Sequence, residues 1–159
     1  MYFVELTKNE RFRATHEIGH AIIAEELGVK WSVISIGMGE RTAGYIRYDE
    51  IEETEDNIEK YLLFKTAGEA ITHMIYDELS AISSAQCDRK NIHDFLKKVD
   101  TKYKENAVND YIYRAVLNNI ETFKRLDIKT FIKPIILALI DRKALSRDEF
   151  LTILAAQNQ

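Results

Sequence analysis

The sequence is poor in cysteine, proline and glycine, and each scarcity excludes a class of protein. Its 159 residues include one cysteine, Cys87, one proline and six glycines. One cysteine cannot form an intramolecular disulfide framework, so we expect a reducing compartment, the cytoplasm. The low content of proline and glycine excludes collagen-like and low-complexity chains. We therefore expect a helix-rich globular protein.

Long apolar runs and clusters of basic residues are also missing. No stretch reaches the roughly 18 consecutive apolar residues that a transmembrane helix requires, and Met1–Glu5 is too short and acidic for a signal peptide. The formal net charge is −4 and the pI is near 5.6. Nucleic-acid binding draws on clustered Lys and Arg, which this chain lacks. We expect neither a membrane nor a nucleic acid as partner.

The length and the apolar pattern predict a single domain, residues 1–159, that is mainly α with a small antiparallel β hairpin, an α+β fold. The runs Trp31–Ile36 and Thr42–Tyr48 are rich in β-branched and aromatic residues and favour the two strands of that hairpin. Apolar residues that recur every three or four positions predict helices over about 8–27, 55–79, 88–99 and 108–123, a further one near Pro134, and a last one after Ser146.

Three local patterns predict where helices begin and end. Thr7–Glu10 and Ser146–Glu149 both fit the capping box, in which Ser or Thr is followed three residues later by Glu. Gly28 follows the first predicted helix at the position that favours a left-handed glycine.

The sharpest signal is an H-E-x-x-H motif at residues 16–20, inside the first predicted helix. Residues four apart lie on one helix face, so His16 and His20 can both bind one zinc ion. Glu17 is one position further round the helix, close enough to act as general base towards water. The motif predicts a zinc metallopeptidase, and two helix histidines packed against their neighbours are the simpler alternative.

A catalytic zinc site usually has three protein ligands, so the motif is incomplete by itself. Spacing alone leaves several downstream residues open as the third ligand. The candidates are Glu69, His73, Asp77, Glu78, Asp88 and His93. For Asp88, which opens a predicted helix, the simpler interpretation is an N-cap.

The motif and its flanks resemble the peptidase domain of FtsH-type AAA proteases, whose signature is H-E-A-G-H-A. The resemblance continues through Gly44-Tyr45 in the hairpin, Ala67-Gly68 in the following helix and the segment 84–88, and it spans nearly the whole chain from about Arg13. It implies a zincin-like helical peptidase domain in which Asp88 is the third zinc ligand, with Glu69 as the main rival.

The sequence departs from that family at several points. Glu69 stands where arginine is common, Ser84 replaces a glycine and Ile18 replaces the alanine of the motif. No phosphate-binding G-x-x-x-x-G-K-[ST] loop is present, so we expect a peptidase domain without the ATPase and the membrane anchor. Oligomerisation and an ATPase partner acting in trans both stay open.

We therefore expect a zinc endopeptidase that hydrolyses peptides or unfolded protein segments without ATP. Two alternatives stay open, a regulatory metalloprotease that cleaves one repressor-like protein and a non-catalytic binding module of peptidase fold. The substrate is expected to add as an extra strand to the hairpin, with Trp31–Ile36 favoured over Thr42–Tyr48 as the edge that receives it.

Overall fold

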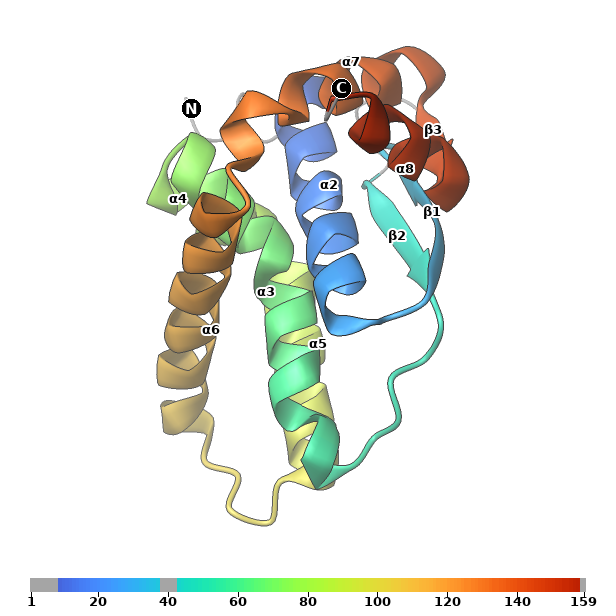
Figure 1. The fold of residues 1–159 in the computed structure, drawn as a ribbon. Helices are drawn as coiled ribbons and strands as arrows, with labels where there is room; N and C mark the ends of the chain where they lie inside the picture. Colours follow the sequence, from blue (N-terminus) through green and yellow to red (C-terminus); the bar gives the residue numbers. More distant parts are fainter. Residues whose placement is uncertain (1–8, 38–42, 158–159) are drawn as a thin grey trace.

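The computed structural model describes residues 9–37 and 43–157 and has the expected mainly α architecture with one small sheet (Figure 1). The elements in chain order are α2 (Glu10–Leu27), β1 (Trp31–Ser35), β2 (Tyr45–Tyr48), η1 (Glu55–Asn57), α3 (Ile58–Ile75), α4 (Glu78–Ser84), α5 (Gln86–Val99), α6 (Glu105–Arg125), η2 (Ile128–Thr130), α7 (Ile132–Arg142), β3 (Ala144–Ser146) and α8 (Arg147–Ala156). The predicted α+β class is confirmed.

The long helices and the sheet form successive layers around α2. Helix α3 packs between α2 and α6, the sheet lies along the other side of α2, and α7 and α8 close one end of the molecule (Figure 1). One hydrophobic core runs through all the layers. Helix α2 is therefore central, and this explains why most of it, including both histidines of the motif, is buried.

The two described helix ends that were predicted from caps form as expected. Gly28 ends α2 in the left-handed conformation, with φ 70°. Ser146 and Glu149 form a complete capping box at the start of α8. Thr7 lies outside the described residues, and at the start of α2 it is the side chain of Asn9 that accepts a hydrogen bond, from Arg11 N.

One prediction about the extent of an element is wrong, and one is extended by the structure. The predicted helix over 55–79 is interrupted, because α3 ends at Ile75 and Asp77 caps the separate helix α4 by accepting from Ser80 N. The predicted hairpin forms from β1 and β2, and it is part of a three-stranded sheet. Its third strand, β3, comes from the far end of the chain, where only a helix cap was expected.

The strand order β2-β1-β3 places β1 in the middle of the sheet. Val33, Ile34 and Ser35 pair with β2 on one side and with β3 on the other, both antiparallel. A strand that is paired on both sides has no free backbone groups to offer to a peptide. The prediction that β1 is the edge that receives a substrate is therefore wrong.

Candidate metal centre

Helix α2 presents both histidines of the motif to the same point in the interior. Both histidines are buried: His16 is 8% exposed and His20 is 3% exposed. Their Nε2 atoms are 3.3 Å apart, as expected for side chains one helical turn apart on one face. Their placement on a buried helix face agrees with the expectation from the motif.

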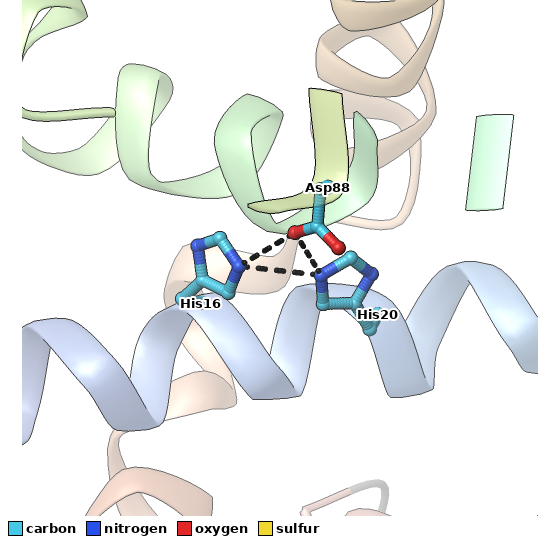
Figure 2. A group of neighbouring side chains, drawn as sticks. All are labelled: His16, His20 and Asp88. Atoms are coloured by element: carbon cyan, nitrogen blue, oxygen red, sulfur yellow. Dashed lines mark hydrogen bonds and ion pairs between the residues drawn. The ribbon is translucent and has the colours of Figure 1, made fainter. Parts of the chain in front are cut away.

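Asp88 completes this cluster from a different helix (Figure 2). Its Oδ2 atom is 3.2 Å from Nε2 of His16 and 3.2 Å from Nε2 of His20. Asp88 lies in the first turn of α5, where a carboxylate is favourable beside the positive end of the helix dipole. It is not an N-cap. Within the part of the chain that the structure describes, these three residues are the group that could hold a metal ion.

The hydrogen bond of His20 determines which of its ring nitrogens has a free lone pair. Nδ1 of His20 is 2.9 Å from the carbonyl oxygen of Phe64. A carbonyl oxygen only accepts, so Nδ1 carries the proton and, in the neutral ring, Nε2 carries the lone pair. That lone pair faces the carboxylate of Asp88. Two electron-rich atoms at this distance attract only when a proton or a metal cation lies between them.

The ring of His16 is positioned by packing rather than by a hydrogen bond. Its buried Nδ1 has no hydrogen-bond partner among the described residues. A Cβ atom on Gly68 of α3 would lie 2.4 Å from Nε2 of His16 and almost as close to two of its ring carbons. The ring therefore rests directly on the backbone of α3, and this contact requires glycine at position 68.

The close approach of α2 and α3 depends on small residues in both helices. A Cβ atom on Gly19 would lie 2.8 Å from the carbonyl oxygen of Ala67 and 2.5 Å from Ile71 Cγ2. The Ala67-Gly68 pair and the glycine of the H-E-x-x-H motif thus face each other at the crossing. Ile18, which departs from the alanine of the family signature, is fully buried in the core.

Glu17 is buried beside the cluster with its carboxyl group against the start of β2. A Cβ atom on Gly44 would lie 2.8 Å from Oε1 of Glu17, so this glycine also allows a close approach. The whole residue is 6% exposed. Burial raises the pKa of its carboxyl group to about 7. The group can therefore both accept and release a proton near neutral pH.

Glu69, the rival third ligand, has a different role. Arg89 donates to both of its carboxylate oxygens, from Nε at 2.7 Å and from a terminal nitrogen at 2.8 Å. Glu69 is buried at 4% exposure, and this bidentate pair raises the pKa of Arg89. Because Arg89 follows Asp88 in the chain, the pair fixes the first turn of α5 to α3 and so helps to place Asp88.

The other downstream candidates also lie outside the cluster. Asp77 is occupied as the N-cap of α4, and Nδ1 of His93 is 3.3 Å from the hydroxyl group of Tyr103. Neither these two residues nor His73 and Glu78 belong to the group that could hold a metal in the described part of the chain.

The sequence analysis did not anticipate Lys65, a buried lysine at the edge of the cluster. Its Nζ is 3.2 Å from Oδ1 of Asp88, and the whole residue is 7% exposed. Burial is the largest single influence and favours the neutral amine, but Asp88, Tyr48 and Tyr61 together outweigh it and raise the pKa of Lys65. Burial likewise favours the neutral acid at Asp88, yet the two histidines hold the pKa of its carboxyl group well below its usual value.

No family model matches this chain. Among the helices in residues 9–37 and 43–157, none combines the length and the apolar character that crossing a bilayer requires. The site and the fold class are therefore the basis for the function proposed below.

Proposed function

We propose that this protein is a zinc-dependent endopeptidase, with His16, His20 and Asp88 as zinc ligands and Glu17 as general base. The observation that carries the proposal is the meeting of the H-E-x-x-H histidines with a carboxylate from another helix, all three donor atoms being 3.2–3.3 Å apart. Ligands of a tetrahedral zinc ion, at bond lengths of 2.0–2.1 Å, are separated by about 3.3 Å.

The donor set also suits zinc chemically. Two imidazoles and one carboxylate are common ligands of catalytic zinc, and three protein ligands leave the fourth position open. The carbonyl group of Phe64, which accepts from Nδ1 of His20, is the kind of outer partner that orients a metal-binding histidine. Zinc bound here would supply Lewis acidity towards water and towards the carbonyl group of the substrate.

The residues of the chain would handle the proton. Glu17 is adjacent to His16 in sequence and is buried, so its carboxylate can take a proton from the attacking water and pass it to the leaving amine.

The substrate is proposed to lie along β2 rather than β1. Strand β2 has a single neighbour in the described sheet, and its first residue follows Gly44, which lies against Glu17. An extended peptide that pairs with this edge would pass beside the general base. Only a flexible or unfolded segment can adopt that extended form, so peptides and unfolded chains are the proposed substrates.

The proposal is tested with purified protein, an unfolded casein-like substrate and a measurement of zinc content. We expect bound zinc, hydrolysis, and loss of hydrolysis with a chelator. Glu17→Gln should retain zinc while hydrolysis falls at least about 10²-fold. Glu26→Gln is the matched control, because Glu26 is on the same helix and pairs with Arg125 at the surface.

Two outcomes would contradict this function. If the zinc-loaded protein hydrolyses neither an unfolded substrate nor a folded protein, it is a binding module and not a peptidase. If Glu17→Gln is as active as the parent, Glu17 is not the base. Cleavage of one folded protein, with casein left intact, would instead favour the regulatory protease.

A further inference from the structure

Lys65 contacts the one oxygen of Asp88 that does not face the histidines. Oδ2 of Asp88 is 3.2 Å from both histidine Nε2 atoms, whereas Oδ1 is 3.2 Å from Nζ of Lys65. One carboxylate oxygen thus faces the histidines and the other faces the lysine. Lysine is rarely this buried unless it is paired, and Asp88 is the partner of Lys65.

The ammonium group of Lys65 is held by more than Asp88. It lies 5.6 Å from the centre of the Tyr48 ring, within the range of a cation–π interaction. Its helix position follows Phe64, whose carbonyl oxygen accepts from His20. Strand β2 and helix α3 therefore fix the cation relative to the histidines before any metal binds.

We propose that Lys65 is a positioning residue that restricts Asp88 to a single donor oxygen. A carboxylate can bind a metal through one oxygen or through both. With Oδ1 paired to the ammonium group, Oδ2 alone points at the space between the histidines, and the open fourth position of the site is preserved. This inference rests on the metal site of the proposed function, but not on the hydrolysis.

A second effect of the lysine acts in the opposite direction. A positive charge close to a metal site repels the metal cation, so removal of Lys65 would strengthen binding if repulsion were the larger effect. Removal weakens binding if orientation of Asp88 is the larger effect. Outer partners of metal ligands commonly contribute 10–100-fold to metal affinity, which favours orientation.

The test compares metal binding by the full chain and its variants, with zinc affinity measured by competition against a chromophoric chelator. Lys65→Met keeps the length of the side chain and removes the charge, and zinc affinity should fall about 10–100-fold. Lys65→Arg keeps a cation that can donate to Oδ1 and should recover most of the affinity. Lys90→Met is the matched control, since Lys90 is also near Asp88 in sequence but is exposed, and its affinity should equal that of the parent.

Cobalt substitution provides a readout that a merely structural role would not change. The parent should give the intense visible absorption of four-coordinate Co²⁺. Lys65→Met should give weaker bands, because the freed Oδ1 joins the coordination. Circular dichroism checks folding, and Lys65→Leu, which also removes both the charge and the donor, replaces the Met variant if that one does not fold.

Two results would overturn the inference. One is a Lys65→Met or Lys65→Leu variant that binds zinc as tightly as the parent or more tightly. The other is an unchanged cobalt spectrum in a folded variant. A parent protein that binds zinc but hydrolyses no peptide would refute the proposed function and leave the role of Lys65 intact, so the two failures are distinguishable.

Discussion

Substitution of Gly68 by alanine should damage the proposed metal site through a single added methyl group. In the native packing a Cβ atom at this position would lie 2.4 Å from Nε2 of His16, where ordinary contacts begin at 3.4 Å. The ring of His16 must therefore move by about 1 Å, or α2 and α3 must separate by a similar amount. Metal–ligand distances tolerate only about ±0.2 Å, so either response removes His16 as a good ligand.

The expected magnitudes differ for metal binding and for folding. Zinc affinity should fall at least about 100-fold, because even outer partners of a ligand contribute 10–100-fold. Stability should change less. Alanine favours a helix over glycine by about 1 kcal/mol, and overpacking costs about 1–3 kcal/mol, so the metal-free protein should lose roughly 0–2 kcal/mol.

A double-mutant cycle separates the clash from every other effect of the methyl group. In a His16→Ala background the ring is gone, so Gly68→Ala should become neutral or stabilise the protein by up to about 1 kcal/mol. Chelator competition gives the affinities, and urea unfolding of the metal-free proteins gives the stabilities. The contact between Gly68 and His16 would be refuted by Gly68→Ala with parental zinc affinity, or by equal stability changes in both backgrounds.

Three further predictions follow from other contacts. Asp88→Ala should lower zinc affinity at least about 100-fold, whereas Glu69→Ala should destabilise the protein and still bind zinc at saturating concentration. If chelator competition shows that Glu69→Ala loses more zinc affinity than Asp88→Ala, the third ligand is Glu69. Ser146→Ala should cost about 1 kcal/mol in urea unfolding, because it removes one half of a capping box, and an unchanged midpoint would show that the cap contributes nothing. Hydrogen bonds from Arg147 lower the pKa of Glu25 below 4.5, so this pair stabilises the protein above that pH and stabilises it less as the pH falls through the lowered pKa. Glu25→Gln should therefore destabilise the protein at pH 7, and the difference in stability from the parent should shrink in acid. Thermal melts at several pH values would contradict this if the difference stayed constant.

Much of the candidate site is local in the chain and could be predicted from the sequence. His16 and His20 share a face because the helical repeat places residues four apart side by side, whatever the rest of the fold does. Gly28 and Ser146 mark helix ends for equally local reasons, since a left-handed glycine and a side-chain cap act within a few residues. The placement of Asp88 was expected only from the resemblance to a family, since spacing left five other residues open.

The tertiary structure decided what depends on distant segments. Asp88 is 72 residues from His16, and an apolar stripe shows that a helix packs without showing against which partner. The same limit hid the pairing of Lys65 with Asp88 and of Glu69 with Arg89, because a charged residue in a helical pattern usually faces solvent.

The sheet also has a part that is local in the chain, the hairpin, and a part that comes from a distant segment, β3. Two neighbouring runs of β-branched and aromatic residues predicted the two strands of a hairpin, because a hairpin closes over a few residues. The third strand, β3, joins from more than a hundred residues away and covers the edge of β1. The sequence by itself thus determined the two histidines, the adjacent glutamate and the helix that carries them. Packing between distant segments decided which carboxylate meets the histidines, which lysine pairs with it and which strand has a single neighbour in the described sheet. Those contacts depend on the shapes of surfaces that form only when the chain has folded.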